Sequence, residues 1–134
     1  MNKYQVRVYF EDTDCGSIVY HTNYLKYCER ARSELFFSKG REPFVGDCGF
    51  VLKHIEADFI ASAKLGDLLE VRSEVVCLKN VSVVLHQRIY KINCASKAVE
   101  QEIFNARITL AFVDALKGKL QKITPEMLEI LHHI

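Results

Sequence analysis

Side chains capable of acid–base chemistry gather in one short span near the N-terminus, residues 9–34, which reads YFEDTDCGSIVYHTNYLKYCERARSE. The turn EDTDCG carries three carboxylates, and a helix is expected directly after it. The first N–H groups of a helix have no partner within it and lie at the positive end of its dipole. A carboxylate just before such N–H groups can attack or hydrate a carbonyl that they polarise. The span therefore predicts either an acyl-transfer site or, more simply, that Asp12 and Asp14 only cap turns.

The same residues allow three other uses. DTDCG has the D-x-D-x-G start of a calcium loop, but Asn23 stands where the bidentate glutamate is needed. Asp12, Asp14 and His21 are possible metal ligands, yet no second histidine follows at ligand spacing. Cys15 and His21 are a possible thiolate pair, although a free cysteine in a turn is more often incidental.

Two further groups of polar residues have a structural and a functional interpretation. Glu29 and Arg32, spaced i and i+3, predict a solvated helix face, and Glu29 becomes a second catalytic carboxylate only if it points into the same crevice. The segment LKNVS joins two expected strands. Its polar residues Lys79, Asn80 and Ser82 can contact a phosphate, but turn formation explains them equally well.

These groups must be positioned by regular elements. Residues 5–10 predict a strand, and the period then changes to that of a helix of about four turns. Thr22 or Asn23 is expected as its N-cap and Gly40 as its stop. Its expected apolar stripe consists of Tyr24, Cys28, Ala31 and Leu35.

The rest of the chain is dominated by alternating segments. Residues 54–59, 69–77, 81–92 and 104–112 predict strands of an antiparallel sheet with one face buried. Thr124, followed by proline, predicts the start of a short C-terminal helix. One long helix with one long sheet indicates an α+β fold, in a single domain over residues 1–134.

Composition excludes several classes of function. A net charge of +1 gives no basic face for nucleic acid, and no apolar run approaches a membrane span. The N-terminus, MNKYQVRVYFEDTD, does not have the pattern of a signal peptide. Five cysteines without a CxxC pair argue against a disulfide framework or a structural zinc site. We therefore expect reduced cysteines and a cytoplasmic protein.

Taken together, the segment RVYFEDTDCGSIVYHTNYLKYCERARSE resembles the opening of the hotdog-fold acyl-CoA thioesterases of the 4-hydroxybenzoyl-CoA thioesterase family. It is most similar to the bacterial branch associated with the Tol–Pal cell-envelope system. Similarities such as ADFIASAKLGDLLEV and RITLAFVD extend the resemblance over the whole chain. The resemblance implies a hotdog fold, in which a five-stranded antiparallel sheet wraps a long central helix, with a short C-terminal helix after it.

The resemblance also assigns roles to residues. Asp14 maps to the catalytic carboxylate, as nucleophile or general base, and the backbone N–H of His21 to the group that polarises the thioester carbonyl. Tyr20, His21 and Tyr24 map to the oxyanion and substrate-binding segment. Lys79, Asn80 and Ser82 are expected to contact CoA. Phe10 replaces a tyrosine that some relatives have, and no metal or cofactor is implied.

The function implied is hydrolysis of acyl-CoA to a free acid and CoA, in lipid metabolism, by a homodimer that assembles into a homotetramer with its active site at the dimer interface. The alternative is a catalytically weak hotdog module that binds acyl-carrier protein or acyl-CoA in an envelope system. A hotdog dehydratase or hydratase is a third possibility, but DTD…YH does not present its usual helix-borne pair.

Overall fold

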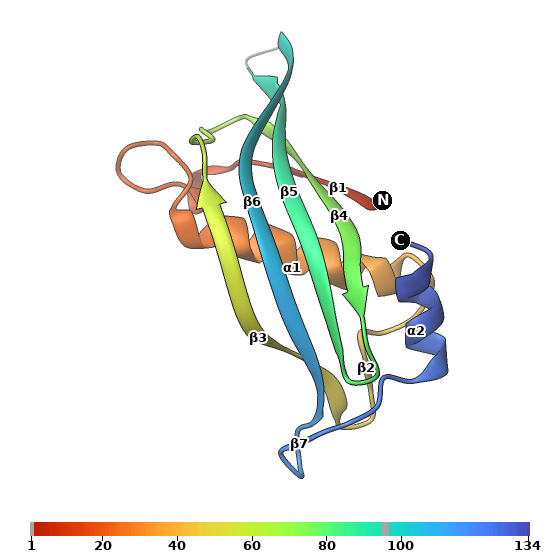
Figure 1. Cartoon of the computed structure of the whole chain (residues 1–134). Helices are drawn as coiled ribbons and strands as arrows, with labels where there is room; N and C mark the ends of the chain where they lie inside the picture. Colours follow the sequence, from red (N-terminus) through yellow and green to blue (C-terminus); the bar gives the residue numbers. More distant parts are fainter. Residues whose placement is uncertain (1, 95–96) are drawn as a thin grey trace.

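The computed structural model describes residues 2–94 and 97–134. It contains one antiparallel sheet, one long helix that crosses a face of the sheet, and a short helix near the C-terminus (Figure 1). The elements in chain order are β1 (Asn2–Arg7), η1 (Phe10–Asp12), α1 (His21–Phe37), β2 (Phe44–Val45), β3 (Cys48–Phe59), β4 (Leu68–Leu78), β5 (Ser82–Cys94), β6 (Lys97–Asp114), β7 (Lys119–Leu120) and α2 (Pro125–His132).

The strand order is β1-β4-β5-β6-β3-β2, and β7 pairs with β6. The five longer strands are those that the sequence indicated, and β2 and β7 add two residues each. The strands curve around α1, which runs diagonally across the sheet in Figure 1, while α2 lies beside the end of β4. The α+β architecture with one helix against one sheet is therefore confirmed.

The core forms where the apolar stripe of α1 meets the inner face of the sheet. Tyr24, Cys28, Ala31 and Leu35 are all buried, as the helical spacing predicted. On the sheet side, β5 alternates buried and partly buried residues along most of its length, as a strand with one covered face should. Burial of each large apolar side chain stabilises the fold by about 1.5–3 kcal/mol.

Two local predictions differ from the structure at the N-terminal end. The first strand spans Asn2–Arg7 instead of residues 5–10, because Val8 N–H already donates to the Asp67 carbonyl and Phe10–Asp12 forms a 3₁₀ turn. The predicted N-cap is also wrong: α1 begins at His21 with Tyr20 as N-cap, and the side chain of Tyr20 makes no capping hydrogen bond. The end of the helix agrees, since Gly40 follows it in the left-handed region at φ 69°.

The third difference is the exposure of β3. Its alternating sequence predicted a buried face, but most of its residues are exposed on both faces. β3 pairs with β6 along one edge, whereas only Cys48 and Gly49 pair with β2 along the other. Most of the outer edge of β3 thus has no pairing strand among the described residues of this chain. Four large apolar side chains at this edge or directly after it are about half exposed: Val51, Leu52, Phe59 and Ile60.

Candidate active site

The segment between η1 and α1 is a small hairpin that carries Asp14. Thr13 forms a β-bridge with Val19, and Asp14 N–H donates to the Ile18 carbonyl at 3.0 Å. The turn closes through Ser17 N–H, which donates to the Asp14 carbonyl at 3.0 Å. Ser17 has φ 62°, a left-handed conformation that costs a non-glycine residue about 1 kcal/mol. The hairpin is therefore held in a strained, defined conformation rather than extended.

Asp12 fastens this hairpin to the helix start. Its carboxylate accepts from Tyr9 N–H at 2.9 Å, and its carbonyl accepts from Tyr20 N–H and from the Asn23 side-chain amide. Asn23, one of the residues expected to cap α1, instead reaches back to Asp12. Asp12 is thus partly buried and fastened to the helix start, whereas the carboxylates of Glu11 and Asp14 are exposed.

The carboxylate of Asp14 is exposed, and one of its two oxygens accepts a hydrogen bond. Its Oδ1 accepts from Gly16 N–H at 2.9 Å, which fixes the side chain relative to the turn. Among the described residues, Oδ2 has no hydrogen-bond partner. An oriented carboxylate with one free oxygen can attack an electrophile or take a proton from water.

The first N–H groups of α1 supply the complementary partner. Asn23 N–H donates to the Tyr20 carbonyl at 2.8 Å, but no acceptor in the described chain receives the N–H groups of His21 and Thr22. They lie at the positive end of a 17-residue helix, where an oxyanion is stabilised. The hairpin and the helix start form one hydrogen-bonded unit, so Asp14 and His21 keep a fixed relative position.

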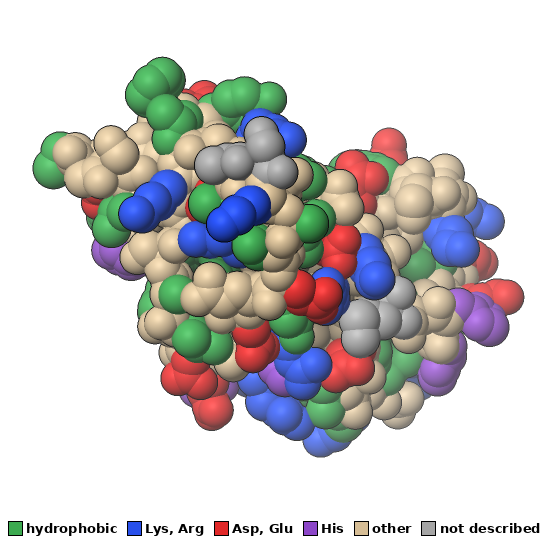
Figure 2. All heavy atoms as spheres, turned by 90° about the horizontal axis from the view of Figure 1, so that it is seen from above, with side chains coloured by type: hydrophobic (Ala, Val, Ile, Leu, Met, Phe, Trp, Pro, Cys, Tyr) green, Lys and Arg blue, Asp and Glu red, His purple; other side chains and the backbone are tan. Residues whose placement is uncertain are grey.

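Aromatic side chains surround the helix start. The ring centroids of Tyr20 and His21 are 4.6 Å apart, and the ring of Phe59 lies 6.2 Å from that of His21. Tyr20 and Phe59 are about half exposed. Figure 2, which views the molecule from above relative to Figure 1, shows hydrophobic side chains exposed on that face among charged ones. Sequence reasoning missed Phe59, because it is 38 residues away from His21 along the chain.

Tyr24 lies in the core and not at the surface of this site. Its ring stacks on Phe104 with centroids 5.5 Å apart, and its hydroxyl accepts from Ala63 N–H at 3.0 Å. Burial raises the pKa of Tyr24, and the hydrogen bond from Ala63 only partly opposes that rise. Val19 N–H in turn donates to the Ala63 carbonyl, so Tyr24 connects the helix to the hairpin that carries Asp14.

Of the predicted CoA-binding residues, Lys79 and Asn80 lie in the turn between β4 and β5, and Ser82 is the first residue of β5. This turn is at the opposite end of β4 from Lys64, whose neighbours contact the Asp14 hairpin. The 11 residues of β4 separate the two ends by about 33 Å. In one chain, therefore, these residues are not brought together with Asp14.

Arg32 and Glu29 do not form the solvated ion pair that their spacing predicted. Arg32 is partly buried, and its Nη1 donates to Gln87 Oε1 at 2.9 Å. Burial lowers the pKa of the Arg32 guanidinium. Glu29 is exposed and accepts from Ser33 Oγ at 3.3 Å. Gln87 was missed by the sequence reasoning because, within an apolar strand face, a single glutamine carries no signal of its buried partners.

The model of the thioesterase superfamily matches residues 16–98, well over half of the chain. The chain belongs to the thioesterase superfamily. The "Acyl-CoA thioesterase YbgC" of Helicobacter pylori is 47% identical over 110 residues, which cover 81% of this chain and 83% of that protein. The "Acyl-CoA thioester hydrolase YbgC" of Escherichia coli O157:H7 is 34% identical over 121 residues, or 87% and 85% of the two chains.

Solved structures of the thioesterase superfamily confirm the predicted hotdog fold. A probable thioesterase from Bartonella henselae has a TM-score of 0.77 and 27% identity, covering 91% of this chain and 96% of that one. Slr0204, a 1,4-dihydroxy-2-naphthoyl-CoA thioesterase from Synechocystis, has a TM-score of 0.85 at 23% identity, covering 99% and 96%. The matched superfamily segment contains His21 but begins two residues after Asp14.

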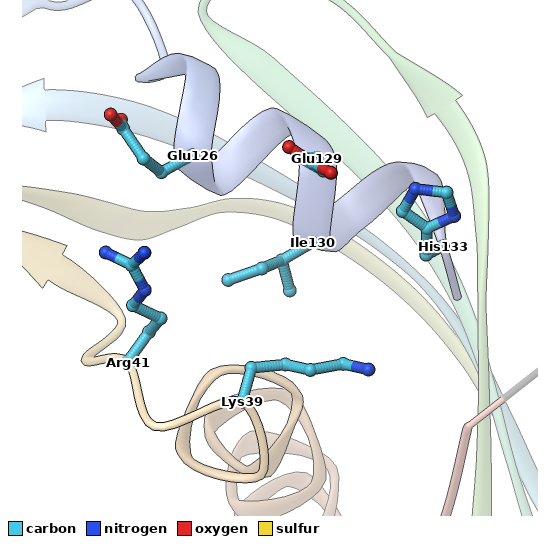
Figure 3. A pocket seen from close by; sticks show the side chains of 6 residues that line it. All are labelled: Lys39, Arg41, Glu126, Glu129, Ile130 and His133. Carbon is cyan, nitrogen blue, oxygen red and sulfur yellow. The ribbon is translucent and has the colours of Figure 1, made fainter.

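Other features of this superfamily member lie away from the helix start. A cavity of about 330 Å³ between the end of α1 and α2 is lined by charged residues of both signs and by Ile130 (Figure 3).

No three His, Cys, Asp or Glu side chains of the described chain come together in a way that would hold a metal ion. No helix found in residues 2–94 and 97–134 is both long and apolar enough to cross a membrane.

Proposed function

We propose that this protein is an acyl-CoA thioesterase that hydrolyses acyl-CoA to a carboxylic acid and CoA. The observation that carries the proposal is an exposed carboxylate, Asp14, in a hairpin that leads directly into the start of α1, whose first two N–H groups have no acceptor among the described residues. The supporting comparison is membership of the thioesterase superfamily, with relatives named acyl-CoA thioesterases.

In the proposed mechanism the thioester carbonyl oxygen binds at the N–H of His21, where negative charge develops as the carbon becomes tetrahedral. Asp14 either attacks this carbon through its free oxygen, giving a mixed anhydride that water then opens, or removes a proton from an attacking water. In both routes the carbon–sulfur bond breaks, the acyl group gains the water oxygen, and the CoA thiolate takes up a proton. The rings of Tyr20 and His21 flank the reacting group.

Substitution of Asp14 tests this assignment. In Asp14→Asn the side-chain oxygen can still accept from Gly16 N–H, so the hairpin should persist while the charge is lost. We expect kcat for the best of a panel of acyl-CoAs to fall about 10²- to 10⁴-fold, measured by release of the CoA thiol. Glu11→Gln, an exposed neighbour, is the matched control and should retain activity. Full activity of Asp14→Asn would remove Asp14 from the chemistry.

The partner proposed for this chain is a second copy that pairs with β3. The free edge and the exposed Val51, Leu52, Phe59 and Ile60 support this, because an uncovered apolar edge strand is a template for pairing. Two-fold pairing within one continuous sheet makes the two copies of β3 antiparallel. The Phe59 end of one strand then lies near the Cys48 end of its partner.

This pairing would bring two separated groups toward each other. The helix start lies beside Phe59, whereas the turn that carries Lys79 lies at the other end of the sheet. In an antiparallel dimer the helix start of one copy faces the Lys79 end of the other. Lys79, Asn80 and Ser82 are therefore proposed to contact the CoA bound at the partner's site, not at their own.

The oligomeric state checks this arrangement. We expect wild type to elute with the mass of at least two chains in size exclusion with light scattering, and Val51→Lys to raise the dimer dissociation constant about tenfold or more. Val76→Lys, at a similarly exposed valine of β4, should leave it unchanged. A wild-type monomer at working concentration would contradict the pairing. Assembly of dimers into a tetramer, binding of acyl-carrier protein, a role in the Tol–Pal system and a cytoplasmic location stay predictions.

A further inference from the structure

Two adjoining hollows follow the side of α1 that faces β3 and β6. Their volumes are about 240 and 330 Å³, and Glu29, Arg32 and Leu52 line both, so we treat them as one groove. The remaining walls are mostly apolar and come from Leu25, Ile55, Ile108, Phe36, Phe50 and Leu110. The groove therefore has the lining expected for an acyl chain, with one cation built into it.

The guanidinium of Arg32 is held from behind by a buried network. Its Nη1 donates to Gln87 Oε1 at 2.9 Å. The Gln87 side-chain amide donates to the Cys28 carbonyl at 3.0 Å and to Ser73 Oγ at 2.9 Å. Both Gln87 and Ser73 are completely buried. Because every partner is fixed, Arg32 has a defined direction in the groove wall.

The charge of Arg32 is not neutralised by a close ion pair. In the part of the chain that the structure describes, no carboxylate oxygen lies within 4.0 Å of the guanidinium, and Gln87 is its one hydrogen-bond partner. Lys26, Glu29 and Arg32 are the ionisable residues of the groove, and their charges of +1, −1 and +1 give a net charge of +1. Glu29, an exposed carboxylate three residues earlier on α1, is the counter-charge that acts on Arg32, and an anionic ligand group in direct contact would further relieve the cost of burying the cation.

We propose that this groove binds the distal part of the acyl group and that Arg32 pairs with a carboxylate at its far end, so that the preferred substrates are ω-carboxyacyl-CoA thioesters. Asp14 and His21 do not line the groove, but Leu25, one turn after His21 on α1, does, and Arg32 lies further along the same helix. With the thioester placed at the helix start, the group that reaches Arg32 would be the far end of the acyl chain. The inference rests on the proposed thioesterase function and adds its substrate class.

The test compares acyl-CoAs that differ only at the far end: hexanoyl-CoA with adipoyl-CoA, and decanoyl-CoA with sebacoyl-CoA. Wild type should have the higher kcat/KM for the carboxylated member of at least one pair. In Arg32→Met this preference should fall about 10- to 100-fold, the size expected for a lost hydrogen-bonded charge pair, and Arg32→Lys should restore part of it. Arg30→Met, the same substitution at an exposed position of α1, should keep the wild-type preference.

A binding measurement separates this inference from the proposed function. Calorimetry with Asp14→Asn should show a lower dissociation constant for adipoyl- or sebacoyl-CoA than for its matched partner, whether or not wild type turns over any thioester. No preference in binding or turnover at either length would overturn the inference while leaving thioesterase activity intact. An equal loss on both members of a pair in Arg32→Met would also overturn it, because that result indicates a purely structural role.

Discussion

The polar side chains at the start and in the middle of α1 differ in their exposure and in the hydrogen bonds that hold them. Near the start of α1 the side chains of Asp14 and His21 are exposed, and backbone hydrogen bonds of the 13–19 hairpin hold this segment in place. Around Arg32, by contrast, side chains from α1, β4 and β5 hold one another beneath the helix. Exposed groups held by the backbone can be changed without opening the core, whereas a buried network cannot lose one member without leaving others unpaired.

This contrast teaches where function and stability are separable. At the helix start, substitutions are expected to change activity more than the free energy of unfolding. In the buried network the order is expected to be reversed. The same helix would thus place its reactive groups where folding does not depend on them.

The largest stability effect is expected at Gln87. Gln87→Leu leaves Ser73 Oγ, the Cys28 carbonyl and the Arg32 guanidinium without their shared partner, and we expect a loss of about 3 kcal/mol in the free energy of unfolding. Urea unfolding followed by circular dichroism measures it. Gln101→Leu, at an exposed glutamine of β6, should change stability by less than about 0.5 kcal/mol. Equal values for the two variants would mean that the network does not stabilise the fold.

A smaller effect is expected at Tyr24, which lies between the two regions. Tyr24→Phe removes the acceptor for Ala63 N–H in a buried place, so we expect a loss of about 1–2 kcal/mol. Tyr9→Phe, at an exposed tyrosine, is the matched control. If KM for acyl-CoA rises strongly while stability stays unchanged, Tyr24 contacts substrate, as the family resemblance implied. The functional region of α1 would then extend from His21 to Tyr24.

The smallest stability effect is expected at His21. Its side chain is exposed and packs on Tyr20 and Phe59 only at the surface, so His21→Ala should change the free energy of unfolding by less than about 0.5 kcal/mol. The backbone N–H remains, and therefore any loss of kcat reports on the imidazole alone. A loss of stability comparable to that of Gln87→Leu would contradict the contrast.

Much of the fold was readable because periodicity reports local geometry. The apolar spacing of Tyr24, Cys28, Ala31 and Leu35 predicted which face of α1 is buried, and the alternation in β4, β5 and β6 predicted strands correctly. The turn at Gly40 and the cap at Thr124 were also readable, since each depends on its own conformation or side chain. The EDTDCG turn and the helix after it were enough to predict where acyl chemistry is to be sought.

Local signals failed where a distant segment competes for the same groups. Asn23 has the side chain of an N-cap, but its amide donates to Asp12, and the helix begins two residues earlier than Asn23. The alternating sequence of β3 indicates two faces, but it does not indicate whether another element covers one of them. Along most of β3, no described part of this chain covers either face.

The sequence by itself determined the element order, the buried stripe of the helix and the carboxylate beside its start, because these depend on residues close together in the chain. Only the tertiary structure decided that Arg32 turns inward. Its partner, Gln87, is 55 residues away, and a helical position of an arginine gives no information about which strand lies beneath it. The tertiary structure also decided that Asp12 is partly buried and joined through its carbonyl to Asn23, whereas the carboxylate of Asp14 stays exposed.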